Sequence, residues 1–149
     1  MEKRESCRAI VFIDGKLVTM KRIKDGRLYY TFAGGGLENG EPHRDCVIRE
    51  CIEEFGITVD PIRHLYTYEN EKTKQYFYLC NYVSGEFGSG VGEEFQEDRN
   101  RGEYEPTLME ISDISVLPLM PPEVASAVAL DAIDLYKDYD KHVREFIVD

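Results

Sequence analysis

Three carboxylates and one guanidinium lie within six positions of the sequence, in the run Arg49-Glu50-Cys51-Ile52-Glu53-Glu54. If this stretch is helical, Glu50 lies one turn from Glu53 and Glu54, and the three carboxylates share one side. Like charges at this spacing repel one another and weaken an isolated helix. A divalent cation removes the penalty, because Mg²⁺ and Mn²⁺ are hard ions that prefer carboxylate oxygens. The pattern therefore predicts a metal site.

The segment between Pro42 and Gly56 is predicted to be the helix that carries these carboxylates. Proline suits a first helical turn, and glycine suits the left-handed residue that follows a helix. Apolar residues recur at three- and four-residue spacing, which predicts one buried stripe formed by Val47, Ile48, Cys51, Ile52 and Phe55. The acidic residues fall largely beside this stripe, so one helix can bury one face and present carboxylates on another.

A glycine-rich turn precedes the helix. Ala33-Gly34-Gly35-Gly36 directly follows the apolar run Leu28 to Phe32, and glycine lets the backbone turn sharply and approach a ligand closely. Taken singly, a triple glycine is usually only a turn, and an acidic helix is usually a solvated surface. A strand, a glycine turn and a carboxylate helix in succession suit a site for a metal ion and a phosphate.

Together these residues resemble the Nudix box, the signature of the Nudix hydrolase family. The pattern consists of Gly35, five residues, Glu41, seven residues and the run Arg49 to Ile57, with every fixed position filled. Ala33 stands where many members have proline, and Cys51 stands where a larger aliphatic residue is usual. Neither departure touches a carboxylate, and the order of the surrounding elements also resembles a Nudix domain.

The resemblance implies roles for the charged residues. Glu50 and Glu54 are the strongest candidates for metal ligands, and Glu53 is a ligand or the group that accepts a proton from the attacking water. Which glutamate is the base stays open, because clustered carboxylates titrate together. Arg49 is expected to hold one of the glutamates by a bidentate contact.

The resemblance also implies supporting roles. Gly34 is expected to offer its carbonyl oxygen to the metal, as the corresponding position does in relatives, with Gly35 and Gly36 shaping the turn. Glu41 is expected to support the site from the start of the helix.

A further metal ligand often comes, in Nudix enzymes, from a segment after the box. The glycine- and glutamate-rich stretch from Ser84 to Gly102 is the least regular part of this sequence. Glu94 is the first candidate by position, with Glu93 and Glu97 behind it. A solvated acidic loop is the alternative for each of them.

The rest of the sequence predicts a mixed β-sheet between helices, that is, an α/β (α+β) sandwich of the Nudix type in a single domain over residues 1–149. Asp14-Gly15 predicts a tight hairpin, residues 23–27 a loop, Asp60-Pro61 a bend, and residues 123–139 a C-terminal helix. Strands are predicted over residues 7–13, 17–22, 28–32, 62–69, 75–83 and 106–111. The three histidines, which are isolated in the sequence, are expected to be surface or packing residues: His43, His64 and His142.

Composition limits the partners. The net charge of −11 repels polyanions, so a long nucleic acid is not expected, whereas a small phosphorylated nucleotide is compatible. The sequence contains no run of about 18 apolar residues, so no membrane span is expected. The start of the chain lacks a signal-peptide profile. The four cysteines lack Cys-x-x-Cys spacing and are interpreted as buried apolar residues of a cytoplasmic protein.

The resemblance implies hydrolysis of a nucleoside diphosphate linked to another moiety, with Mg²⁺ or Mn²⁺ as cofactor. The leading hypothesis is a nucleoside triphosphate pyrophosphohydrolase, with oxidised nucleotides among its substrates. One alternative is an ADP-ribose or nucleotide-sugar pyrophosphatase, because the box does not separate these substrates. A non-catalytic nucleotide-sensing module is a third hypothesis, which the complete set of glutamates disfavours. A homodimer is an open alternative, since Nudix relatives are often dimers.

Overall fold

The computed structural model describes residues 2–90, 102–137 and 142–149. Its elements, in chain order, are β1 (Arg4–Ile10), β2 (Phe12–Ile13), β3 (Lys16–Lys24), β4 (Arg27–Gly36), α1 (His43–Phe55), β5 (Ile57–Glu69), β6 (Thr73–Gly85), β7 (Glu103–Met109), the 3-10 helix η2 (Ile111–Asp113), β8 (Leu119–Met120), α2 (Pro122–Asp131) and β9 (Arg144–Ile147).

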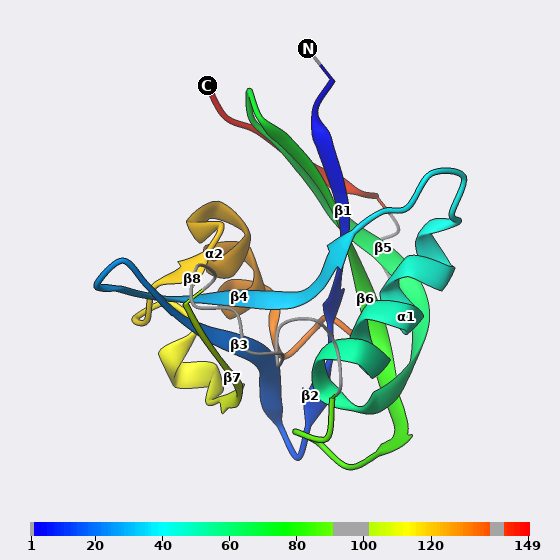
Figure 1. The fold of residues 1–149 in the computed structure, drawn as a ribbon, viewed down its shortest axis with the longest axis vertical. Coiled ribbons are helices and arrows are strands. Elements are labelled where there is room, and N and C mark those ends of the chain that lie inside the picture. Colours follow the sequence, from blue (N-terminus) through cyan, green and yellow to red (C-terminus); the bar gives the residue numbers. More distant parts are fainter. Residues whose placement is uncertain (1, 91–101, 138–141) are drawn as a thin grey trace.

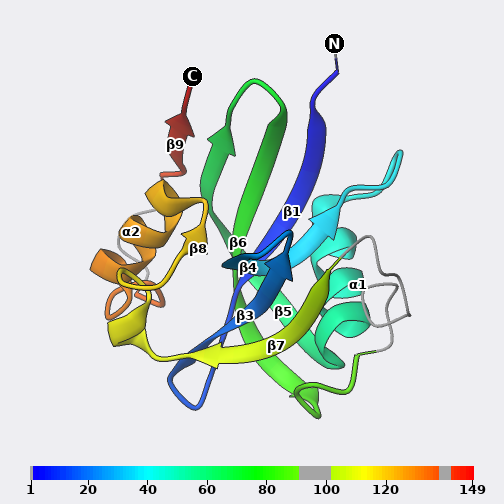
Figure 2. The same ribbon diagram turned by 60° about the vertical axis from the view of Figure 1, so that its left-hand side comes forward.

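The strands form one mixed, curled sheet. Its order is β2-β3-β4-β1-β6-β5-β9, with β7 paired to β3 and β8 paired to β4. β1 runs parallel to β6, β8 to β4 and β9 to β5, and the other pairs are antiparallel. Figures 1 and 2 show α1 and α2 on opposite sides of this sheet. The predicted sandwich with a mixed sheet is confirmed.

Each face of the sheet packs its own core, because successive side chains of a strand point to opposite faces. The core beneath α1 includes Cys7, Ala9, Cys46, Val47, Cys51 and Phe55. The core on the other face, covered by α2, includes Ile10, Phe32, Phe77, Val124 and Val128. All four cysteines are buried free thiols, as the spacing predicted.

Two-residue turns set the hairpins at the start of the chain. Asp14 and Gly15 have φ of 52° and 77°, which is the left-handed pair of a tight hairpin, as predicted. Asp25 and Gly26 repeat this geometry with φ of 52° and 74°. The predicted loop over residues 23–27 is therefore wrong: β3 and β4 stay paired up to Lys24 opposite Arg27.

The predicted bend at Asp60-Pro61 is also wrong, because β5 continues through it. Its pairing with β6 shifts register after Thr58 and again between Pro61 and Arg63. These irregularities accommodate a proline, which has no N–H to give to a ladder. The strand therefore continues through Asp60-Pro61 with irregular pairing.

The C-terminal part departs most from the prediction. α2 ends at Asp131 instead of running on to Tyr139, which lies outside the described residues. The chain around Leu135 forms turns instead of a helix, but Leu135 is still buried, as its apolar spacing predicted. β9 has no counterpart in the prediction, because it is a short, largely exposed strand that pairs along one end of β5. No helix in the described ranges is long and apolar enough to cross a bilayer.

The core on the α2 side should be sensitive to truncation at Phe77. This side chain is fully buried, and its ring meets that of Phe32 edge to face, with centroids 5.2 Å apart. Phe77→Ala is expected to lower the free energy of unfolding by about 3–5 kcal/mol, because it leaves a cavity. Val116→Ala, at a site that is 75% exposed, should change it by less than about 0.5 kcal/mol. Urea unfolding measures both, and equal losses would contradict the assigned core.

Candidate active site

The helix α1 turns two carboxylates toward the sheet. Glu50 and Glu54 lie one turn apart and are only 7% and 5% exposed. Ile52, which the predicted stripe placed in the core, is instead 46% exposed. Cys51 and Phe55 are buried as predicted. The buried surface of α1 is therefore partly acidic.

The glycine turn at the end of β4 makes room for these carboxylates. The N–H of Gly34 donates to Glu54 Oε1 at 2.9 Å. A Cβ built on Gly35 would lie 2.6 Å from the carboxyl carbon of Glu50, and one on Gly34 would collide with the backbone of Cys7. Gly34 has φ of 128°, a conformation that other residues rarely adopt. The carboxylates of α1 can therefore contact the turn directly only because residues 34 and 35 are both glycine.

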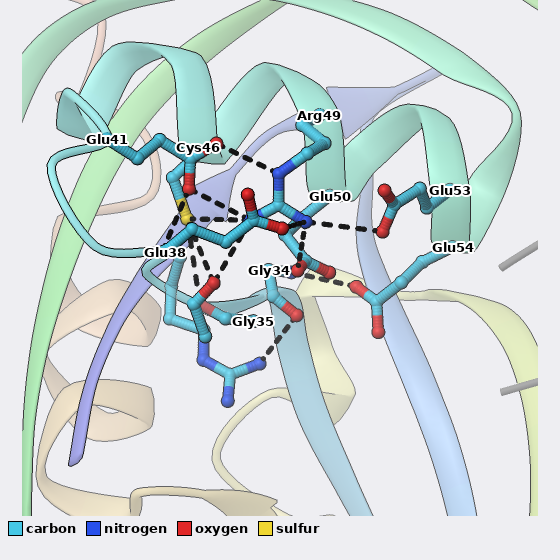
Figure 3. A network of polar contacts seen from close by, with 11 residues as sticks. Gly34, Gly35, Glu38, Glu41, Cys46, Arg49, Glu50, Glu53 and Glu54 are labelled. Carbon is cyan, nitrogen blue, oxygen red and sulfur yellow. Dashed lines mark hydrogen bonds and ion pairs between the residues drawn. The ribbon is translucent and has the colours of Figure 1, made fainter. Parts of the chain in front are cut away.

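Arg49 joins the glutamates of α1 to the loop before it (Figure 3). Its Nε and Nη2 donate to the two oxygens of Glu41, each at 2.9 Å, which is a bidentate contact. Its Nη1 donates to Glu50 Oε1 at 2.9 Å and to Glu53 Oε2 at 3.3 Å. Nη2 also donates to the carbonyl of Gly36 at 3.1 Å. One guanidinium thereby positions three predicted site carboxylates against the glycine turn.

This contact changes the ionisation of both partners. The hydrogen bonds from Arg49 are the main reason that the pKa of Glu41 falls to about 2. The same hydrogen bonds raise the pKa of Arg49 above its ordinary value. Both groups are therefore charged throughout the physiological range, and their attraction is permanent.

Gly34 is held from its other side by Arg8, a residue of β1. Nη1 of Arg8 donates to the carbonyl oxygens of Gly34 and Phe32, each at 3.1 Å. The predicted metal-ligating oxygen of Gly34 thus already accepts a hydrogen bond from a cation. Burial lowers the pKa of Arg8. Arg8 was not among the predicted site residues. Its position inside the apolar run of residues 7–13 was a usable signal, since a guanidinium shielded from water needs acceptors.

The donor set fits a hard divalent cation. Glu50, Glu53 and Glu54 offer carboxylate oxygens from one side of α1, and the absence of a side chain at Gly35 leaves space for the carboxylate of Glu50. In the described ranges, no group of three or more His, Cys, Asp or Glu side chains is already arranged to hold a metal ion. Glu94, the predicted downstream ligand, lies outside the described residues, as do Glu93 and Glu97.

Two of the histidines pack against tyrosine rings, in agreement with the expected packing role. The ring of His43 lies 4.3 Å from that of Tyr76, and its Nδ1 lies 2.7 Å from the hydroxyl of Tyr78. The ring of His64 stacks on Tyr78 with centroids 4.7 Å apart. The pairing of β5 with β6 brings these rings together, which the sequence spacing does not reveal.

The profile of the NUDIX domain matches residues 3–147 of the chain. A match of this extent settles the class of protein: a hydrolase of acid anhydrides whose box lies where the glycine turn meets α1. The chain belongs to the Nudix hydrolase family, whose members generally use a divalent metal ion.

Many solved structures share this fold, including the following three. An ADP-ribose pyrophosphatase from Streptococcus suis is 19% identical and matches 99% of this chain and 100% of its own, with a TM-score of 0.66. A NUDIX hydrolase from Nitrosomonas europaea is 14% identical over 99% and 81%, with a TM-score of 0.72. A MutT NUDIX hydrolase from Burkholderia pseudomallei is 22% identical over 84% and 96%, with a TM-score of 0.65. A search of curated protein sequences gave no match.

A methyl group on Gly35 should disturb the site more than one on Gly36. Gly35→Ala places Cβ against the carboxylate of Glu50, whereas the nearest atom to a Cβ on Gly36 lies 3.7 Å away, in Arg4. We expect Gly35→Ala to lower kcat about 10-fold or more by displacing Glu50, and Gly36→Ala to retain most activity. Turnover measured with both folded variants tests this, and equal rates would show that the close approach at Gly35 is unimportant.

The ion pair between Arg49 and Glu41 should make the free energy of unfolding depend on pH in the acidic range. Because the pKa of Glu41 is lowered from 4.5 to about 2 in the folded protein, its stabilising contribution is complete above pH 4.5 and is lost as the pH falls through about 2. The stability gap between the wild type and Glu41→Gln should therefore narrow over that range. Urea unfolding at several pH values measures the gap, and a gap independent of pH would refute the assignment.

Proposed function

We propose that the protein is a metal-dependent nucleotide pyrophosphohydrolase that acts on nucleoside triphosphates, oxidised ones included. The observation that carries the proposal is the burial of Glu50 and Glu54 directly against Gly34 and Gly35. Buried carboxylates require compensating positive charge or hydrogen bonds. Arg49 and Arg8 supply two positive charges beside the three glutamates of α1. A divalent cation fits this acidic site and would also attract a phosphorylated substrate.

The residues that would hold Mg²⁺ or Mn²⁺ are Glu50, Glu54 and Glu53, with the Gly34 carbonyl and Glu94 as further ligands. When bound, such an ion neutralises the diphosphate oxygens and lowers the pKa of a water molecule. The chain itself would then have to position the substrate and the attacking water relative to each other.

Among the three glutamates of α1, Glu53 is best placed to take a proton from the attacking water. Its side chain is 42% exposed, compared with 9% for Glu50. Arg49 Nη1 contacts both carboxylates and so fixes their separation. Glu50 and Glu54 are therefore assigned to metal binding alone, whereas Glu53 is assigned proton acceptance in addition to metal binding.

The charge balance supports a small substrate. At a net charge of −11, the surface field disfavours a long polyanion. A single nucleotide needs only the local positive charge of Arg49, Arg8 and the metal ion. We therefore propose a soluble nucleotide of the cytoplasm as the substrate.

Glu54→Gln should remove most activity while preserving the fold. Glutamine keeps an oxygen that can accept from Gly34 N–H but lacks the charge, so kcat should fall about 100-fold or more. Glu110→Gln is the matched control, since its side chain is 59% exposed and pairs only loosely with Lys16 at 3.5 Å. Release of phosphate or pyrophosphate from a nucleotide panel with Mg²⁺ or Mn²⁺ measures both variants.

Identification of the products separates the candidate substrates. A nucleoside monophosphate plus pyrophosphate supports the proposal, whereas AMP plus ribose phosphate from ADP-ribose would replace it with a nucleotide-sugar activity. The absence of metal-dependent turnover by folded protein, together with tight nucleotide binding, would instead indicate a sensing module.

A further inference from the structure

A cavity of about 260 Å³ opens on the side of the sheet that α2 covers. Its polar wall includes Arg8 of β1, Gln75 of β6 and Asn70, which lies between β5 and β6. The cavity adjoins the glycine turn, because Arg8 also binds the carbonyl of Gly34. Its volume suits one ring system better than a whole nucleotide.

The amide of Asn70 can only donate to a ligand. Its Oδ1 already accepts from the backbone N–H groups of Lys72 and Thr73, at 2.9 and 2.8 Å, and from the Thr73 hydroxyl at 3.3 Å. Backbone N–H groups are donors only, so they fix which end of the amide is oxygen. Within the described ranges, the Nδ2 of Asn70 has no hydrogen-bond acceptor, which leaves two donors for a ligand.

Gln75 and Arg8 also have N–H donors that remain available to a ligand. Oε1 of Gln75 accepts from Arg8 Nε at 3.2 Å, and because a guanidinium never accepts, Nε2 of Gln75 must face elsewhere. Nη1 of Arg8 serves the carbonyls of Phe32 and Gly34. Nη2 of Arg8 and Nε2 of Gln75 meet no acceptor in the part of the chain that the structure describes.

All three side chains thus present donors and no acceptor, and one of them is cationic. A ligand group that fills the cavity must therefore offer acceptor atoms. A ligand donor that faces these three side chains would meet another donor and leave both unsatisfied.

The rest of the cavity lining, apart from Thr31, is largely apolar and favours a flat ring over a bare phosphate. It is formed by Met120, Pro121 and Pro122, together with Tyr68. Tyr68 and Pro121 are buried. Aromatic and proline surfaces pack well against a heteroaromatic ring.

We propose that this cavity selects the nucleobase of the substrate by its keto edge. Guanine and hypoxanthine present O6 and N7 as acceptors, and uracil presents O4, whereas adenine and cytosine place an amino group at the corresponding position. The amino group would face the donors of Arg8, Gln75 and Asn70. The inference rests on the proposed function, because it names the substrate class of that reaction.

The discriminating pairs are ITP against ATP and UTP against CTP, which differ at the keto or amino position. The wild-type enzyme is expected to prefer the keto member by about 10-fold or more in kcat/KM. Equal values for both pairs would overturn the proposal.

Two substitutions reverse the polarity of the cavity without removing its internal bonds. Asn70→Asp keeps the oxygen that holds Lys72 and Thr73, and Gln75→Glu keeps the oxygen that holds Arg8, but each replaces an N–H donor by an acceptor. Each should reduce the preference for ITP over ATP about 10-fold, through KM more than through kcat. Asn81→Asp, at an exposed position of β6, adds the same charge and should leave the preference unchanged.

A binding measurement that needs no hydrolysis can test this inference independently of the proposed function. Calorimetry with IMP and AMP in the presence of EDTA should show the keto preference in the wild type and its loss in the two variants. That result without any triphosphate turnover would support the cavity and reject the proposed function. Equal binding of IMP and AMP would show that the cavity does not discriminate the base and would overturn the proposal. Displacement of IMP by ribose 5-phosphate alone would show that the cavity binds a phosphate and would overturn it as well.

Discussion

The site depends on one guanidinium shared among carboxylates that would otherwise repel each other. Glu50 and Glu53 sit within a turn of one another on α1, and Glu41 reaches toward them from the preceding loop. Like charges at this spacing destabilise a helix. Arg49 offsets the repulsion, and its bidentate hold on Glu41 gives direction as well as charge. The orientation of α1 and the shape of the loop before it follow from this contact.

The second constraint is the absence of side chains in the glycine turn. Because Gly34 and Gly35 add no bulk, the helix can approach the end of β4 with Glu50 and Glu54 at the contact. This explains why Ile52 is exposed although its spacing predicted burial. The surface that α1 faces includes the backbone N–H of Gly34, which needs a hydrogen-bond acceptor. A carboxylate provides that acceptor, whereas an isoleucine side chain does not.

Local features were predictable from the sequence. Gly56 ends α1 in the left-handed conformation, with φ of 72° and ψ of 19°, and Asp14-Gly15 forms the expected turn. The box identified the family, since its spacing encodes a turn and a helix that are adjacent in the chain. These features depend on residues within a few positions of one another, where propensity and periodicity carry most of the information.

Features built by long-range pairing were not predictable in this way. The contacts of Arg8 arise because β1 pairs with β4 on one side and with β6 on the other, residues more than twenty positions away. β9 forms only by adding to an existing strand. The acceptors that Arg8 binds and the strand that β9 joins are both distant in the sequence, so neither contact has a local signal. The clustering of His43 and His64 with tyrosines has the same cause.

The double hold on Gly34 bears on how the site responds to ionic strength. Its N–H donates to the buried carboxylate of Glu54, and its carbonyl accepts from the half-buried guanidinium of Arg8, so two charges of opposite sign bind a single residue. Counterions weaken exposed pairs such as Lys3 with Glu69 far more than partners shielded from solvent. We therefore expect the contacts of Glu54 and Arg8 with Gly34 to depend less on salt concentration than the exposed ion pairs of the surface.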